Sequence, residues 1–483
     1  MSRADLIAIA PLIVVTASTV VLMLAVAIRR AHALAAGLSW LGLGTALLSL
    51  GPAWSAAPHQ VAALLVIDQY GLLYMALVLA GSLVAAIFAH GYQKGNASPP
   101  EEFYLLLLLA SLGSCVLVVS SHFVSLFLGL EILSVALYAL IAYPRLRREP
   151  VEAGMKYLVL GSASAAFLLF GMALVYAQLG TMSLGRLAAA VGSGSLTADP
   201  VIALGVALML TGAGFKLGVV PFHLWAPDVY EGAPATVGGF IATVSKASMV
   251  ALVFRYFTDV NISSYRSVLV ALSAIAVASM FAGNLLALLQ NNLKRILAYS
   301  SISHLGYVLV AIQVPGREAA EAAAYYLTAY LITLLLAFGA IAVVSNGEED
   351  SDRLEDYRGL FWRNPLPATA LTAAMLSLAG IPLTAGFIGK FYIVAAGVEA
   401  ALWPLVIILV VTSVIGLFYY LRVVVMLYGE SPQDAPRSTQ PAAGAPTGGR
   451  IALSALLLAL LVFGVYPAPL MTMIRNAASG LLH

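Results

Sequence analysis

Four lysines and one glutamate interrupt the long apolar stretches of this chain. They are Lys156, Lys216, Lys246, Lys390 and Glu131. A charged side chain at the centre of a bilayer costs roughly 3 kcal/mol on insertion scales, so it is rarely present without a role. Five such groups therefore call for a functional explanation. Movement of protons or ions through a membrane explains them best.

The composition predicts a membrane protein. Of the 483 residues, 61% are hydrophobic and only 10% are charged, whereas soluble domains carry about 25% charged residues. The net charge of +2 is too small to indicate a nucleic-acid partner. Cys115 is the single cysteine, so we expect neither an intrachain disulfide nor a cysteine metal cluster. The first apolar stretch lacks a cleavable signal and should remain as a helix.

The apolar runs are long enough for about fourteen membrane-spanning helices, since one span needs about 20 residues. The predicted spans are 5–28, 33–51, 61–90, 103–121, 122–143, 153–179, 201–222, 233–257, 266–289, 293–314, 319–345, 365–397, 401–428 and 451–473. The chain is thus predicted to be all-α and polytopic.

The loop charges orient these spans. With the N-terminus outside, most loop lysines and arginines fall on the inner side, as the positive-inside rule requires. Both termini are then expected on the outer side. The charged loop 348–363 becomes cytoplasmic, and residues 431–449, rich in Pro, Ala and Gly, become an irregular cytoplasmic linker.

Two halves of the chain echo each other in spacing. Glu131 precedes Lys216 by the same number of residues, within one, as His304 precedes Lys390. An odd number of helices separates corresponding members, so the second copy would be inverted, as in many transporters. We therefore predict two inverted five-helix repeats; coincidental spacing is the alternative. The predicted units are an N-terminal three-helix segment at 1–100, repeats at 101–260 and 261–430, and a linker with the last helix at 431–483.

Helix-breaking residues lie in the middle of the seventh and twelfth spans. The seventh contains TGAGFKLGVVPFH and the twelfth AGIPLTAGFIGKFY. Glycine and proline permit or force non-helical backbone, and unpaired backbone groups survive at membrane depth only beside a polar cavity. We predict that both helices are broken next to a buried lysine. A proline kink without function is the alternative.

The ionisable side chains suggest an order for proton transfer. Burial lowers the pKa of a lysine, whereas a nearby carboxylate raises it, so a lysine under both influences can change state when its partner moves. We hypothesise that Glu131 and Lys216 form such a pair, that Lys246 relays the proton and that Lys390 releases it outwards. Snorkelling to the interface is a serious alternative for Lys156, and a structural salt bridge is one for Glu131.

Two histidines are further candidate relays, because histidine titrates near neutral pH. His223 lies in VVPFHLWAPD, and His304 lies in AYSSISHLGYV among Tyr299, Ser300, Ser301 and Ser303. The hydroxyls could order a water chain, although packing is an equal alternative for each histidine. The chain lacks phosphate-binding and dinucleotide-binding glycine motifs. ATP, NADH, haem and iron–sulfur clusters are therefore not expected on this chain, and its energy must come from an ion gradient or a partner subunit.

Three long segments resemble the antiporter-like subunits of respiratory complex I. They are GAGFKLGVVPFHLWAPDVYEGAPATVGGFIATVSKASMVALVF at 212–254, NLKRILAYSSISHLGYVLV at 292–310 and SLAGIPLTAGFIGKFYIV at 377–394. The resemblance covers essentially the whole chain. It implies a proton-translocating membrane-arm subunit of NADH:quinone oxidoreductase in a bacterial inner membrane. By position, it assigns Glu131 and Lys216 to the family's helix-five and helix-seven pair, and Lys246 and Lys390 to its helix-eight and helix-twelve sites.

The resemblance also implies partners and cofactors. Other membrane-arm subunits would surround this chain in the lipid bilayer, and NADH, FMN, iron–sulfur clusters and a quinone would be bound by other subunits, with no redox chemistry here. Three alternatives stay open: a subunit of an Mrp-type cation/proton antiporter, an equivalent subunit of a hydrogenase or photosynthetic complex, and a scaffold whose lysines are structural.

Overall fold

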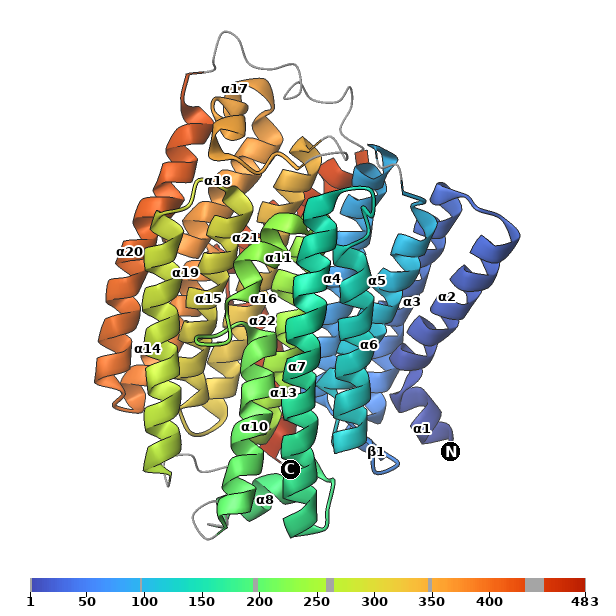
Figure 1. Ribbon diagram of the computed structural model, residues 1–483, viewed down its shortest axis with the longest axis vertical. Coiled ribbons are helices and arrows are strands. Elements are labelled where there is room, and N and C mark those ends of the chain that lie inside the picture. The colour runs from blue at the N-terminus through green and yellow to red at the C-terminus, as the bar shows by residue number, and fades with distance from the viewer. Residues whose placement is uncertain are drawn as a thin grey trace.

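The computed structural model describes residues 2–95, 98–193, 199–257, 265–345, 350–430 and 447–482. It is a bundle of helices that run mostly along one direction (Figure 1). The helices are α1 Arg3–Ala8, α2 Ala10–Ile28, α3 His32–Ala56, α4 Gln69–Tyr92, α5 Glu101–Val118, α6 Phe123–Ile141, α7 Arg148–Leu179, α8 Leu184–Gly192, α10 Pro200–Leu217, α11 Trp225–Gly232, α12 Ala235–Phe240, α13 Lys246–Phe257, α14 Arg266–Leu288, α15 Leu293–Ile312, α16 Arg317–Val344, α17 Leu360–Arg363, α18 Pro365–Ala379, α19 Ala385–Glu399, α20 Trp403–Tyr428, α21 Thr447–Val465 and α22 Ala468–Ala478.

Within the described residues, 13 helices are long and apolar enough to cross a membrane. They correspond to the predicted spans except for the twelfth, 365–397. That segment consists of α18 and α19, each of 15 residues. The all-α, polytopic prediction is confirmed.

The third span was predicted to begin too early. Residues 59–67 form a short antiparallel hairpin, β1 His59–Val61 with β2 Leu65–Ile67. Helix α4 begins only at Gln69, because the Asp68 carboxylate caps it by accepting a hydrogen bond from the Gly71 amide. Asp68 also forms a buried ion pair with Arg255 of α13, so this carboxylate links α4 to α13.

Three spans form the centre of the bundle. In Ala235–Phe257, α15 and α16, about nine-tenths of the residues are buried inside the protein (94%, 89% and 89%), whereas in the outer spans α2, α10 and α14 about a third or less are buried. The outer helices expose many large apolar side chains, such as Leu48, Val425 and Phe418, as expected for a surface that faces lipid. Polar side chains in the central helices can therefore contact only protein or internal water.

Two helices end beside a buried lysine, in the segments that the sequence marks. Helix α10 ends at Leu217, where Gly218 adopts a left-handed conformation (φ 74°). Helix α18 ends at Ala379, where Gly380 does the same (φ 82°). Glycine is favoured there because other residues are strained at positive φ. The further predictions, that each interruption divides a single span, that the helices form two inverted repeats and that the chain divides at 100, 260 and 430, stay predictions.

The two ends of the bundle differ. Both chain termini lie at the end that carries α8 and β1, opposite to α17 (Figure 1). Within the predicted cytoplasmic loop, residues 354–363 form a 3₁₀ turn and α17. Most of the predicted irregular linker, residues 431–446, lies outside the described residues, and helix α21 begins directly after it at Thr447.

Candidate functional site

Lys216 lies near the carboxyl end of α10, buried to 5% exposure. Its Nζ donates hydrogen bonds to the hydroxyls of Ser134 on α6 (2.9 Å) and Tyr157 on α7 (3.0 Å). The ammonium also lies 5.3 Å from the centre of the Tyr157 ring. Three helices thus hold this lysine among hydroxyl groups and away from lipid.

Glu131 lies one turn before Ser134 on α6, so both side chains project from the same face of the helix. Its carboxylate interacts electrostatically with Lys216. No ion pair within 4 Å joins the two in the part of the chain that is described, and the Ser134 hydroxyl contacts the lysine instead. The buried Oε1 of Glu131 has no hydrogen-bond partner there. The predicted pair is therefore an electrostatic pair without direct contact.

Lys246 is almost fully buried (1% exposed) at the start of α13, directly after a π-helical turn at Ile241–Ser245. Its Nζ donates to the Ser301 hydroxyl on α15 at 2.5 Å. Tyr330 on α16 donates to the same hydroxyl at 2.6 Å. A Cβ added to Gly218 would lie 3.7 Å from this Nζ. Lys246 therefore sits where the end of α10 meets the two central helices.

His304 bridges two tyrosines one turn further along α15. Its Nδ1 lies 2.6 Å from the Tyr326 hydroxyl on α16, and its Nε2 lies 3.1 Å from the Tyr420 hydroxyl on α20. The Tyr420 hydroxyl also contacts the Ser300 hydroxyl. Since an imidazole can accept a proton at one nitrogen and release one at the other, this arrangement suits a relay.

Lys390 lies near the start of α19, a few residues after the segment in which the sequence predicts a break. Its Nζ donates to two free carbonyls at the end of α18, of Leu378 (2.7 Å) and Ala379 (3.2 Å), and to the Ser413 hydroxyl of α20 (2.7 Å). The carbonyls are available because α18 ends there. The interruption thus supplies part of the binding site for this lysine.

Lys216, Lys246 and Lys390 each have at least one hydroxyl partner. A carbonyl can only accept a hydrogen bond, whereas a hydroxyl can accept one or donate one. A hydroxyl can therefore pair with an ammonium by accepting, or with the lone pair of a neutral amine by donating. These sites can hold the lysine in either protonation state without movement of a helix.

Two predicted residues lie away from this row. Lys156 is half exposed and pairs with Glu152 (3.0 Å) and Asp228 (2.8 Å), at the wall of a polar cavity. His223 lies between α10 and α11 with its Nδ1 buried and without a hydrogen-bond partner among the described residues. Neither side chain contacts one of the buried lysines directly in any recorded hydrogen bond.

The polar cavity has a volume of about 850 Å³ and opens at the end of the bundle near α11 and the start of α15. Its wall carries both signs of charge, from Arg147, Glu149, Glu152, Lys156, Asp228, Glu231, Lys294, Arg295, Asp350, Asp352, Arg353 and Asp356. Asp228 pairs with two cations at once, Lys156 and Arg295. Partial burial raises the pKa of Asp228, but the hydrogen bonds and charges of these two cations outweigh burial, so its pKa lies below the ordinary value.

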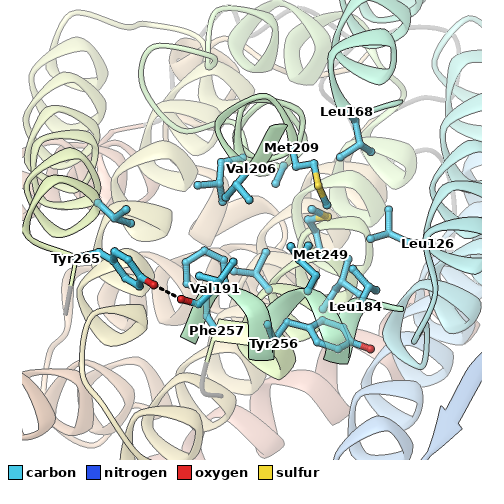
Figure 2. Close-up of a pocket in the computed structure, with 17 residues that line it drawn as sticks. Leu126, Leu168, Leu184, Val191, Val206, Met209, Met249, Tyr256, Phe257 and Tyr265 are labelled. Atoms are coloured by element: carbon cyan, nitrogen blue, oxygen red, sulfur yellow. Dashed lines mark hydrogen bonds between the residues drawn. The ribbon is translucent and has the colours of Figure 1, made fainter. Parts of the chain in front are cut away.

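A second pocket, of about 140 Å³, is apolar. It lies between α6, α7, α8, α10, α13 and α14, and residues such as Leu168, Met209 and Met249 point into it (Figure 2). The hydroxyl of Tyr265 at its edge donates to the Val191 carbonyl. The described residues that line this pocket are apolar apart from the two tyrosines, Tyr256 and Tyr265.

The sequence identified the buried lysines and His304, but not most of their partners. Ser134, Tyr157, Tyr330, Tyr420 and Ser413 were missed. Ser134 could have been found, because it lies three residues after Glu131 on one helix face. The serines flanking His304 were expected to supply hydroxyls, and Ser300 and Ser301 do so. Tyr420 and Ser413 come from a distant helix and carry no local signal.

A transmembrane bundle with a row of buried lysines, hydroxyls and a histidine defines an ion-translocating membrane protein. Residues 120–416 match the family described as NADH:quinone oxidoreductase/Mrp antiporter, transmembrane. The chain belongs to this family.

Within the family, the likeness is to one type of subunit. The chain is 50% identical to "NADH-quinone oxidoreductase subunit N" of Ectopseudomonas mendocina (strain ymp), over 98% of this chain and 96% of that protein. It matches a chain of respiratory complex I from Thermus thermophilus with a TM-score of 0.83 and 33% identity, over 96% of this chain and 99% of that one. A chain of the Mrp complex from Dietzia sp. DQ12-45-1b shares the fold, with a TM-score of 0.85, 23% identity and coverage of 100% and 98%. The resemblance seen in the sequence is confirmed.

Proposed function

We propose that this chain is a proton-translocating membrane-arm subunit of an NADH:quinone oxidoreductase. The observation that carries the proposal is the row Lys216, Lys246, His304 and Lys390, each buried and each bonded to hydroxyls, in a chain half identical to a subunit N. Partner subunits carry the NADH, FMN, iron–sulfur and quinone chemistry, and this chain carries none of it. The bundle lies in a bacterial inner membrane.

The charge distribution supports one orientation. The cavity end holds Arg147, Lys294, Arg295 and Arg353, and most of the lysines and arginines in the predicted loops fall on this side of the spans. By the positive-inside rule the cavity faces the cytoplasm and both termini face the periplasm. Protons therefore enter through the charged cavity beside Lys156 and leave near Lys390.

The proton crosses the bundle in steps between hydroxyl-bonded groups. It moves from Lys216, poised by Glu131, to Lys246, whose Nζ lies beside the end of the same helix that carries Lys216. Tyr330 bonds to Ser301 through its hydroxyl, and its ring lies 5.4 Å from the His304 ring. Tyr330 therefore links the Lys246 cluster to the cluster of His304 and Tyr420. Tyr307 links onward, since Lys390 Nζ lies 5.4 Å from its ring centre. Bridging water completes the gaps, and His223 supplies a further polar group near the start of the path.

The test is proton pumping by the assembled complex in inverted membrane vesicles carrying Lys216→Ala or Glu131→Gln. We expect assembly and content of the complex to persist while NADH-driven pumping falls by roughly tenfold or more, as for loss of a group that transfers a proton. Arg186→Ala, an exposed residue of α8, is the matched control and should pump normally. Normal pumping by both site variants would leave the chain as a scaffold.

The same preparation tests the Mrp-type alternative. Pumping by this chain should follow the oxidation of NADH by a quinone and should be independent of added sodium or potassium ions. A transport activity that persists without electron transfer and exchanges a metal cation for protons would favour the antiporter.

A further inference from the structure

Helices α7 and α11 are joined by a narrow seam that begins in the charged cavity. At its outer level the two backbones pack closely: a Cβ added to Gly232 would lie 2.5 Å from the Ala153 Cβ and 2.9 Å from the Glu149 carbonyl. One level deeper, Lys156 Nζ lies 2.8 Å from the Asp228 carboxylate. Ala153, Gly232, Lys156 and Asp228 all line the cavity.

Below the ion pair, the seam is aromatic. The rings of Tyr157 and Trp225 lie 4.8 Å apart, and Phe215 packs on both at 6.2 and 5.5 Å. Trp225 is fixed by a hydrogen bond from its Nε1 to the Phe215 carbonyl. Both Tyr157 and Trp225 are buried, and neither lines the cavity.

The order of these levels along the two helices is regular. On α7, Tyr157 follows Lys156, and on α11, Trp225 lies one turn before Asp228. Going inwards from the cavity, both helices therefore contribute first to the ion pair and then to the ring pair. Figure 1 shows α11 above α10, with α7 alongside both. The Tyr157 hydroxyl on the far side of the rings contacts Lys216. The aromatic layer thus separates the cavity from the first lysine of the row.

We propose that the Lys156–Asp228 ion pair and the Tyr157–Trp225 ring pair form a gate that controls access of water and protons from the cavity to Lys216. This inference rests on the proposed function, because it assigns the uptake step of the same path. Asp228 and Lys156 are positioning residues in it: they hold the rings together and do not carry the proton. Tyr157 connects the gate to the lysine.

The ion pair is suited to opening. Both side chains are about two-fifths exposed (44% and 36%), and such pairs are weak because water competes for them. When Lys156 moves away, Asp228 keeps a cationic partner in Arg295. Opening of the gate therefore does not leave the Asp228 carboxylate unpaired. The close contact at Gly232 remains as a pivot while the Trp225 end of α11 moves away from α7.

The chemical step behind the gate is a simple proton transfer. Once the rings separate, a hydronium ion in the cavity water can pass its proton, through the Tyr157 hydroxyl, to Lys216 Nζ while that nitrogen is a neutral amine. The products are an ammonium and a water molecule. Closure of the rings then isolates the charged lysine from the cavity.

The gate can be tested by the reach of a water-soluble reagent. A Ser134→Cys substitution places a thiol beside Lys216, and a small methanethiosulfonate modifies thiols only through water. Its modification rate in inverted vesicles, followed by mass spectrometry of this subunit, reports access from the cavity. The native Cys115, buried in α5, is the internal reference.

Asp228→Asn in this background should accelerate modification at position 134 by roughly two- to fivefold, the upper part of the range expected from loss of a weak pair. Lys156→Gln breaks the same pair from the other helix and should act alike, and Asp228→Glu should restore slow modification. Glu231→Gln is the matched control: Glu231 lies on the same helix and also pairs with Arg295 (2.6 Å), but has no recorded contact with Lys156.

Unchanged rates in both Asp228→Asn and Lys156→Gln would overturn the gate. An equal acceleration in Glu231→Gln would also overturn it, by showing that α11 has merely loosened. The reagent measures access and not pumping, so these outcomes leave the proposed function standing. Normal pumping by both Lys216→Ala and Glu131→Gln would overturn the proposed function, and the modification rates do not enter that test.

Discussion

The regions around Lys216 and Lys390 have the same backbone arrangement, but the two lysines have different hydrogen-bond partners. In each, a helix ends at a left-handed glycine, Gly218 or Gly380, close to a buried lysine. Lys216 then contacts two hydroxyls, of Ser134 and Tyr157. Lys390 contacts two carbonyls and a single hydroxyl.

This difference teaches how each lysine can change charge. Carbonyls accept hydrogen bonds from both an amine and an ammonium, but they stabilise the ammonium more, because charge-assisted hydrogen bonds are stronger. Only the hydroxyl can reverse its role when the lysine becomes neutral. We infer that Lys390 depends on one reversible group, whereas Lys216 has two and relies on the electrostatic influence of Glu131.

The largest predicted effect comes from arginine at either lysine. An arginine keeps the positive charge but cannot release its proton in a protein. If both lysines must be deprotonated in each cycle, Lys216→Arg and Lys390→Arg should lower NADH-driven pumping by roughly tenfold or more, as much as alanine does. Pumping in inverted vesicles measures this. Retained pumping in one arginine variant would mean that this lysine acts only through its fixed charge.

Removal of a single hydroxyl should reduce pumping more at Lys390 than at Lys216. Ser413→Ala takes away the only hydroxyl that binds Lys390 in the described structure, whereas Ser134→Ala leaves Lys216 the Tyr157 hydroxyl. A hydrogen bond to a charged group contributes about 1.5–3 kcal/mol. We expect a loss of pumping of roughly tenfold or more for Ser413→Ala and, because a second hydroxyl remains, roughly threefold or less for Ser134→Ala.

A double variant tests whether the number of hydroxyl partners explains this difference. Adding Tyr157→Phe to Ser134→Ala removes both hydroxyls of Lys216 and should bring the loss to the level of Ser413→Ala. Equal effects of the two single variants would mean that the number of reversible partners is irrelevant.

How far the sequence predicts this molecule depends on the range of each interaction. Apolar length and the expense of buried charge are local signals, so the spans and Lys216, Lys246 and Lys390 could be predicted. The start of α4 was wrong because residues 59–67 are apolar enough for a helix but pair as a hairpin ahead of the Asp68 cap. A hydropathy scan measures only how apolar a segment is, so it detects neither the pairing of two strands nor a helix cap.

The partners of the lysines were harder to predict, for a physical reason. Ser413 reaches Lys390 from α20, and Tyr420 reaches His304 from the same helix, so both depend on how distant helices pack. A serine or tyrosine costs little free energy in an apolar span, so its presence there does not indicate a function. The Ser134 hydroxyl that binds Lys216 was missed for a related reason: the sequence predicts Glu131 and Lys216 as a pair but does not show which hydroxyls contact the lysine.

A smaller effect is expected from alanine at the two left-handed glycines. Both substitutions place a side chain at positive φ, which costs roughly 1–2 kcal/mol, so the thermal stability of the complex should fall similarly in both. A Cβ at Gly380 would meet Lys390 Cδ at 3.1 Å and Nζ at 3.3 Å, whereas one at Gly218 would meet nothing closer than 3.5 Å. Gly380→Ala should therefore lose more pumping, by a few-fold. The reverse order would place the critical geometry at the end of α10.

The smallest effect is expected from a change of pH on the gate proposed beside Lys216. Because Lys156 and Arg295 hold the pKa of Asp228 below its ordinary value despite partial burial, the ion pair is fully present above the ordinary pKa of an aspartate. It is lost only as the pH falls through that lowered pKa. Between about pH 6 and pH 8 the modification rate of Ser134→Cys, corrected for ionisation of the thiol by the rate of an exposed cysteine, should therefore stay constant. A steep rise towards pH 6 would show that another group titrates in the gate, and His223, which lies between α10 and α11, would be the first to replace, by His223→Gln.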